Sequence, residues 1–173
     1  MMVAVAVGAR VIAVDSQPAA RAKAEAMGAY ASVEAGATAV EKVIALADGI
    51  GADCALDCAG FAETSEAAVL SVRRAGRMVQ VGLPLGGRTP EIPMARVANR
   101  EIEIVGSHGM AAAEFPKVLA LVAEGKLKVQ ELVEREVGLA EGALAVEHMD
   151  HGSPVGITVI TSFDRAECEV CPS

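Results

Sequence analysis

An aspartate ends a short apolar segment near the start of this 173-residue chain. The segment, residues 8–15 (GARVIAVD), is followed at once by Ser16, Gln17 and Pro18. If residues 10–14 form a strand, Asp15 lies at its C-terminal end. A carboxylate there can accept hydrogen bonds from the two ribose hydroxyls of an adenosine. The alternative is that Asp15 only caps the helix that follows.

The charge of Asp15 bears on which dinucleotide would bind. A carboxylate repels a 2′-phosphate, so the sequence favours NAD over NADP. A Gly-x-Gly-x-x-Gly turn normally stands roughly 20 residues before such an acid. Only fourteen residues precede Asp15, and they contain no such motif. We therefore expect a dinucleotide-binding chain that starts after its glycine turn.

Composition excludes several other classes of protein. Hydrophobic residues make up 53% and charged residues 22%, which is typical of a folded domain and not of a disordered one. The net charge is −8 and the basic residues are scattered, so we expect no nucleic-acid partner. No apolar run reaches the roughly 18 residues of a membrane helix, and residues 1–9 lack the basic start of a signal peptide. The sequence predicts a cytoplasmic protein without a membrane partner.

Strands and helices are expected to alternate along the first hundred residues. Residues 1–9 resemble the end of a buried helix that Gly8 terminates, and Ser16 is the expected N-cap of the next helix. Such alternation predicts an α/β fold with a parallel sheet and right-handed crossovers, covered on both faces. The expected strands are 10–14, 30–33, 54–58, 77–81 and 102–105, and the expected helices are 16–27, 37–47, 62–72 and 94–99.

The last third of the chain has a different pattern. Residues 111–124 have the spacing of an amphipathic helix, with Phe115, Val118, Leu119 and Val122 expected to face inward. A strand, a helix and a strand are then expected at 132–137, 140–149 and 155–160. From Ser162 the chain is polar and without periodicity.

Several of these segments, in this order, resemble one known family. They are residues 8–15, 77–84 (RMVQVGLP) and 103–109 (EIVGSHG), together with the closing segments 137–141 and 156–160. They are similar to the zinc-dependent alcohol dehydrogenases of the medium-chain dehydrogenase/reductase family, over about residues 1–162. The resemblance implies a Rossmann-like parallel sheet that lacks its first βα unit, followed by the C-terminal return segment of the catalytic domain.

The resemblance also implies a domain organisation. Residues 1–106 would form a truncated NAD(P)-binding Rossmann domain, 107–162 the C-terminal segment of the catalytic domain, and 163–173 a polar tail. The family's zinc ligands precede its glycine motif, so zinc belongs to the parent enzyme and we expect neither metal-binding nor catalytic residues in this chain. The family's first strand lies between its second and fourth strands.

Six residues are expected to bind NAD. By the resemblance, Asp15 contacts the adenosine ribose, and the others contact the nicotinamide and its ribose, partly through backbone groups. The alternative for the glycines is that they only relieve turns. The family often has a lysine at the position of Ala20, next to Arg21. The six expected cofactor-binding residues are Asp15, Ala59, Gly60, Val81, Gly82 and Val105.

Other residues with reactive side chains have plainer explanations. Asp57 lies within an apolar strand and must be paired if it is buried. Cys54 and Cys58 are expected to be small core residues. His108 is interpreted as a solvated loop histidine, and the run 148–151 (HMDH) as a helix end. Cys168 and Cys171 lack the second pair of ligands that a structural zinc requires.

The sequence therefore predicts a fragment of an oxidoreductase that transfers a hydride between an alcohol or aldehyde and NAD. Without the zinc-binding half we expect the chain alone to be inactive and to bind NAD weakly or not at all. The alternative is a non-catalytic dinucleotide-binding or dimerisation module. Because the segment 101–105 pairs across the dimer in the family, we expect a homo-oligomer.

Overall fold

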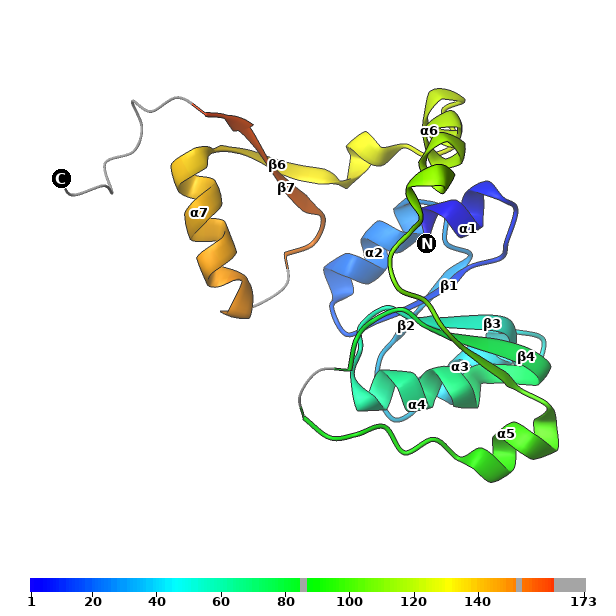
Figure 1. Cartoon of the computed structure of the whole chain (residues 1–173). Helices are drawn as coiled ribbons and strands as arrows, with labels where there is room; N and C mark the ends of the chain where they lie inside the picture. The colour runs from blue at the N-terminus through cyan, green and yellow to red at the C-terminus, as the bar shows by residue number, and fades with distance from the viewer. Residues whose placement is uncertain (85–86, 152–153, 164–173) are drawn as a thin grey trace. The chain divides into compact units, whose positions relative to one another are not determined.

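The chain folds into two compact units, residues 1–115 and residues 116–173 (Figure 1). A computed structural model describes residues 1–84, 87–151 and 154–163. Cys168 and Cys171 lie outside the described residues, as does the expected polar tail from residue 164 onward. Each unit is built around its own parallel strands.

The first unit contains two parallel sheets. In one, β1 (Ile12–Asp15) pairs with β2 (Ala31–Glu34). In the other, β4 (Val72–Gln80) lies between β3 (Ala52–Asp57) and β5 (Glu103–Gly106). All three pairings are parallel, which confirms the predicted α/β class.

Helices connect these strands as the alternation predicts. The helices of this unit are α1 (Met2–Ala6), α2 (Pro18–Ala26), α3 (Ala39–Leu46), α4 (Ala62–Ser71) and α5 (Met94–Arg100), with a 3₁₀ turn, η1 (Ala112–Glu114). Helix α2 packs on β1 and β2, and α4 packs on β3 and β4 (Figure 1). Helix α3 contacts β1, β2 and α4, so it joins the two sheets.

The buried side chains are small and aliphatic, as the shortage of aromatic residues requires. Val33, Ala39 and Val43 form a cluster between β2 and α3, with Ile12 and Leu46 packed against it. Val69, Val72 and Met78, which are at most 2% exposed, form the core between α4 and β4. Apolar residues at the spacing of one helical face produce this packing in α3.

The second unit repeats the strand–helix–strand order. It contains α6 (Phe115–Ala123, which begins at the boundary), η2 (Val129–Leu132), β6 (Val133–Gly138), α7 (Leu139–Glu147), η3 (His148–His151) and β7 (Ile157–Ser162). Strands β6 and β7 are parallel, and α7 packs on both. None of the described helices is long and apolar enough to cross a membrane.

The prediction that the strands are covered on both faces is wrong for β3. Cys54 and Cys58 are exposed, so they are not core residues, and Leu56 is 59% exposed. Side chains alternate between the two faces of a strand. Helix α4 covers the face that carries Asp57, while Cys54 and Leu56 lie on the opposite face.

Three local predictions also need correction. Helix α1 has only five residues and none of them is buried, although Val5 lies near Gly28. The N-cap of α2 is Gln17 and not Ser16. Phe115 and Leu119 are 51% and 60% exposed, so the expectation that they face inward is wrong.

The terminal strands of both sheets in the first unit have open edges. Among the described residues β1 pairs only with β2, and β3 pairs only with β4. Val14 and Leu56, on these two edge strands, are 47% and 59% exposed. An open edge next to exposed apolar side chains favours pairing with another chain.

We expect the purified chain to self-associate through these edges. Replacing Leu56 by Lys should shift it toward monomer, because an edge charge opposes strand pairing. Val146→Lys, at a residue of α7 that is 65% exposed, is the matched control and should change nothing. Size-exclusion chromatography with light scattering measures the effect. A monomer with a sharp and reversible thermal transition would contradict this expectation.

Candidate functional site

Asp15 lies where the sequence analysis predicts, at the C-terminal end of β1. It is the last residue of the strand, is half-buried and lies opposite Glu34 of β2. Its Oδ1 accepts a hydrogen bond from the backbone amide of Gln17 at 2.8 Å. The carboxylate therefore shapes the turn into α2 with one oxygen. The second oxygen has no partner among the described residues, so turn formation and ligand binding are compatible.

Asp57, at the end of β3, is the centre of a buried polar network. It is 3% exposed and accepts four hydrogen bonds. Oδ1 accepts from the backbone amides of Ala59 and Gly60, at 3.0 and 3.2 Å. Oδ2 accepts from the hydroxyl of Ser65 at 2.8 Å and from Nε2 of Gln80 at 2.7 Å. One carboxylate thus joins the turn after β3, the start of α4 and the end of β4.

The partners of Asp57 keep it ionised. Burial alone would raise its pKa, because it disfavours the charged form, but the bonds from Gln80, Ser65 and Gly60 outweigh burial. The pKa of Asp57 therefore lies below its ordinary value of 3.8. Since the folded pKa is the lower one, these bonds stabilise the fold above about pH 4, and this stabilisation is lost as the pH falls through the folded pKa.

The turns that follow β3 and β4 touch each other through their backbones. A Cβ placed on Gly82 would lie 2.5 Å from the amide nitrogen of Gly60 and 2.8 Å from the carbonyl oxygen of Cys58. A Cβ on Gly60, which has φ +75°, would lie 2.7 Å from the carbonyl oxygen of Leu83. Only glycine fits at either position. The absence of side chains at these two glycines permits the close contact between the two turns.

Hydrogen bonds extend the same network to β5. The amides of Val81 and Gly82 donate to the carbonyl oxygen of Asp57 at 2.9 and 2.8 Å. The amide of Ser107, directly after β5, donates to the carbonyl oxygen of Gln80 at 2.9 Å. The carboxyl ends of β3, β4 and β5 are therefore held together. Val81 and Val105 lie along this edge and are 40% and 41% exposed.

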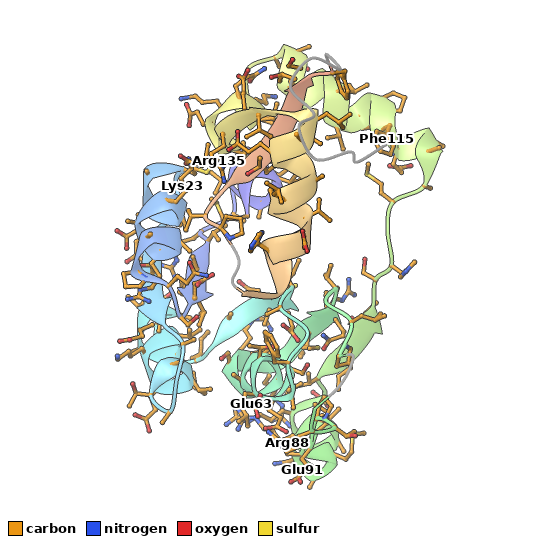
Figure 2. All side chains as sticks on the ribbon, turned by 90° about the vertical axis from the view of Figure 1, so that its left-hand side faces the viewer. Lys23, Glu63, Arg88, Glu91, Phe115 and Arg135 are labelled. Atoms are coloured by element: carbon orange, nitrogen blue, oxygen red, sulfur yellow. The ribbon has the colours of Figure 1, made fainter. Side chains whose placement is uncertain are left out.

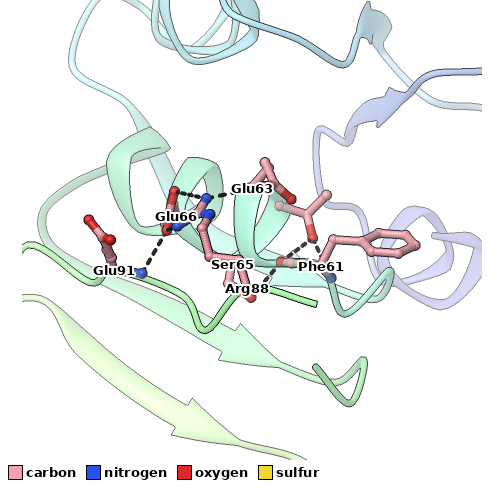
Figure 3. A network of polar contacts seen from close by, with 7 residues as sticks. Phe61, Glu63, Ser65, Glu66, Arg88 and Glu91 are labelled. Carbon is pink, nitrogen blue, oxygen red and sulfur yellow. Dashed lines mark hydrogen bonds and ion pairs between the residues drawn. The ribbon is translucent and has the colours of Figure 1, made fainter. Parts of the chain in front are cut away.

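The loop after β4 is fastened to α4 by Arg88. Its guanidinium binds both carboxylate oxygens of Glu66, at 2.6 and 3.0 Å, and one of Glu63 at 3.1 Å (Figure 3). The amide of Glu91 also donates to Glu66 at 2.6 Å. Glu63, Arg88 and Glu91 gather at one end of the first unit (Figure 2). We call this cluster of Arg88, Glu63, Glu66 and the Glu91 amide the Arg88 clamp. Arg88 and Glu91 follow the Gly82 turn in the sequence.

The clamp changes the acidity of its members. Hydrogen bonds from Arg88 and from the amide of Glu91 lower the pKa of Glu66 from 4.5 to about 2. Glu66 in turn, with Glu63, raises the pKa of Arg88. The ion pair between Arg88 and Glu66 therefore persists at pH values above about 2.

Sequence analysis did not find Gln80, Ser65, Arg88 or Glu66. A signal existed for Gln80. It lies directly before the Val81-Gly82 turn, just as Asp57 lies shortly before the turn of Gly60. In the structure Asp57 and Gln80 are opposite each other in the paired strands. For Arg88, nothing in the sequence specifies which of the nearby acids it binds.

The remaining candidates do not join this site. His108 is exposed in the loop after β5. His148 is exposed, and its Nδ1 lies 2.7 Å from the carbonyl oxygen of Leu144 at the end of α7. A separate hollow in the second unit is lined by Arg135, Glu141, Leu144, Ala145 and His148. Among the described residues no three His, Cys, Asp or Glu side chains are arranged to hold a metal ion.

In α/β proteins with parallel sheets, ligands commonly bind at the carboxyl ends of the strands, which is where these turns lie. The family model described as zinc-binding dehydrogenase matches residues 1–124. The chain therefore belongs to the zinc-binding dehydrogenase family, which confirms the resemblance drawn from the sequence segments.

Individual relatives give the same result. The chain is 30% identical over 146 residues to sorbitol dehydrogenase 1 of Saccharomyces cerevisiae, covering 80% of this chain and 40% of that protein. It is 25% identical over 139 residues to the D-arabitol-phosphate dehydrogenase of Enterococcus avium, covering 80% and 39%. The chain thus spans about two fifths of the length of these curated relatives.

Solved structures agree on the fold. The crystal structure of an NAD-dependent alcohol dehydrogenase superposes with a TM-score of 0.84 at 28% identity, over 94% of this chain and 46% of that one. The alcohol dehydrogenase of Aeropyrum pernix superposes with a TM-score of 0.76 at 29% identity, over 88% and 43%.

The contact between the two glycine turns can be tested with one methyl group. Gly82→Ala should lower the free energy of unfolding by roughly 1–3 kcal/mol, because the Cβ meets rigid backbone. Gly106→Ala is the matched control, since a Cβ at Gly106 meets nothing within 4 Å. Urea denaturation of both variants makes the comparison. Equal stability of the two would show that the turns are not in close contact.

The Asp57 network can be tested by removing its charge. Asp57→Asn should cost about 2–4 kcal/mol of stability at neutral pH, because an amide cannot accept from all the donors around it. Asp53→Asn, on the same strand but exposed, is the control. The difference between wild type and Asp57→Asn should shrink as the pH falls below about 4. Thermal unfolding at several pH values measures both effects, and a pH-independent difference would contradict the assignment.

Proposed function

We propose that this chain is the cofactor-binding part of an oxidoreductase that transfers a hydride between an alcohol and NAD. The observation that carries the proposal is the edge formed by the strand ends. Asp15 ends β1, and the mutually packed turns of Gly60 and Gly82 follow β3 and β4. Membership of the zinc-binding dehydrogenase family supports the same function.

Each residue of this edge has a proposed role. The carboxylate of Asp15 accepts hydrogen bonds from the ribose hydroxyls of the adenosine, and its charge favours NAD over NADP. Ala59, Gly60 and Gly82 present backbone groups to the nicotinamide half. The partly exposed side chains of Val81 and Val105 supply apolar contacts for its ring. NAD, when bound, supplies the carbon that accepts or returns the hydride.

The proposed organisation assigns residues 1–106 to the dinucleotide-binding domain, 107–162 to the C-terminal segment of the catalytic domain and 163–173 to a tail. The described residues do not fit a zinc site, so zinc is assigned to other parts of the parent enzyme. Recognition of an alcohol or aldehyde is assigned to other parts of the parent enzyme. The chain alone is therefore proposed to be inactive. We also propose that it acts in the cytoplasm, with neither nucleic acid nor membrane as a partner.

The second candidate function, a dimerisation module, rests on β5. All four residues of this strand are exposed, and it pairs only with β4 among the described residues. An open outer edge of this kind supports a homo-oligomer. The two functions are compatible, since the cofactor edge and the outer edge of β5 use different backbone groups.

NAD titration tests the main proposal. We expect affinity weaker than micromolar, because the sequence contains no Gly-x-Gly-x-x-Gly turn for the pyrophosphate. Asp15→Ala should weaken binding a further roughly tenfold, since it removes charge-assisted hydrogen bonds. Glu34→Ala, at the neighbouring strand end, is the control. Micromolar affinity would show that the chain holds a complete site, and insensitivity to Asp15→Ala would remove Asp15 from it.

A further inference from the structure

Strand β3 and the residue after it carry three exposed side chains in a symmetrical order. Cys54 and Cys58 are exposed, and Leu56 between them is 59% exposed. Because side chains alternate along a strand, Cys54 and Leu56 lie on one face, and Cys58 continues the same alternation. The order cysteine, leucine, cysteine is the same in both chain directions. A patch of this kind suits contact with a second copy of itself about a twofold axis.

The backbone of these residues is directed to the open edge of β3. The carbonyl oxygen of Asp57 accepts hydrogen bonds from the amides of Val81 and Gly82, so Asp57 directs its backbone groups toward β4. Successive residues of a strand direct their N–H and C=O groups to opposite sides. Cys54 and Leu56 therefore direct theirs away from β4, to the side where β3 pairs with no other described strand. This edge can accept an added strand.

Acidic side chains limit how two antiparallel copies of β3 can pair. If Cys54 of one copy lies opposite Leu56 of the other, Asp53 lies opposite Asp57 of the other copy. Like charges directly opposite each other are destabilising, and pairing centred on Asp57 has the same fault. Pairing centred on Leu56 avoids it. Asp57 then lies opposite Ala55, and the two copies of Leu56 meet at the axis.

We infer that two copies of this chain pair through the open edges of β3, antiparallel and centred on Leu56. Cys54 of each copy then lies opposite Cys58 of the other. The pairing brings two exposed leucines into contact and makes one continuous sheet of the two sheets that contain β3. It uses the edge of the sheet opposite to β5, so it is a different interface from the one proposed for β5, and it does not depend on cofactor binding. The competing register is centred on Cys54 and leaves Leu56 opposite Ala52.

The opposed cysteines give this register a chemical signature. Opposite residues of a hydrogen-bonded antiparallel pair have Cα atoms about 5.5 Å apart, within the roughly 4.4–6.8 Å that a disulfide spans. Within one chain, Cys54 and Cys58 are about 13 Å apart along an extended strand, so they cannot be bridged. Diamide, a diazene, takes one proton and one electron from each of two thiols and becomes a hydrazine, while the two sulfurs form the disulfide. Oxidation therefore reports contact between two chains.

The test uses the full chain with Cys168 and Cys171 replaced by Ser, so that Cys54 and Cys58 are the remaining cysteines. Cys54→Ser and Cys58→Ser are made separately in this background. Each is oxidised with diamide alone and in an equimolar mixture of the two. Non-reducing electrophoresis measures the linked dimer, and isotopic labelling of one variant identifies mixed dimers by mass spectrometry. Thermal unfolding verifies that each variant is folded.

We expect the background chain to form a disulfide-linked dimer. Each single variant should form at least about tenfold less, because its remaining cysteines lie about 13 Å apart in the paired strands. The equimolar mixture should regain the disulfide, and only between unlike chains. Leu56→Lys should abolish the linked dimer in the background chain, since two charges would meet at the axis. Val146→Lys, on α7, should leave it unchanged.

Three results would overturn the inference. If Cys58→Ser forms as much linked dimer as the background chain, the axis lies at Cys54. If both single variants and their mixture are linked equally, the disulfides come from random collision. If the background chain forms no linked dimer, β3 does not pair in this register, whether the chain is a monomer or associates through another edge such as β5. None of these results bears on the proposed cofactor site, so the two proposals fail separately.

Discussion

The described site depends on one buried charge. A carboxylate removed from water must be met by donors, or it destabilises the fold. Asp57 meets this requirement with two amides of the turn that follows it, the hydroxyl of Ser65 and the amide of Gln80. These donors come from three elements that lie up to 23 residues away in sequence. Satisfying the carboxylate therefore fixes the end of β3, the start of α4 and the end of β4 relative to one another.

The glycine turns depend on that fixation. Gly60 and Gly82 can approach closely because neither has a side chain, but close approach by itself stabilises little. The amides of Val81 and Gly82 also bind the carbonyl oxygen of Asp57, so the acid holds both turns, one through its side chain and the other through its backbone. Asp15 differs, because its single bond to Gln17 is local and leaves an oxygen for a ligand. Asp57 therefore holds the turns after β3 and β4 together, whereas Asp15 keeps one carboxylate oxygen available to a ligand.

Much of this fold could be predicted from the sequence, because alternating strands and helices leave local periodic signals. The positions of Asp15 and of both glycine turns at strand ends followed from the same signals. The exposure of Cys54, Cys58 and Leu56 could not be predicted, since an apolar strand does not record which of its faces another element will cover. The clamp of Arg88 could not be predicted either, because its partners depend on the tertiary structure and not on sequence spacing.

The two halves of the proposed dinucleotide site rest on different sheets. Asp15 belongs to the β1–β2 sheet, while the turns of Gly60 and Gly82 belong to the sheet of β3, β4 and β5. Helix α3 connects the sheets through side-chain packing, but no backbone hydrogen bonds join β1 to β3. A dinucleotide that contacts both must hold the two sheets at one fixed separation. Part of the free energy of dinucleotide binding then offsets the cost of ordering the two sheets. Whatever pairs with the open edges of β1 and β3 would supply the same order in advance, so strand pairing and cofactor binding should reinforce each other.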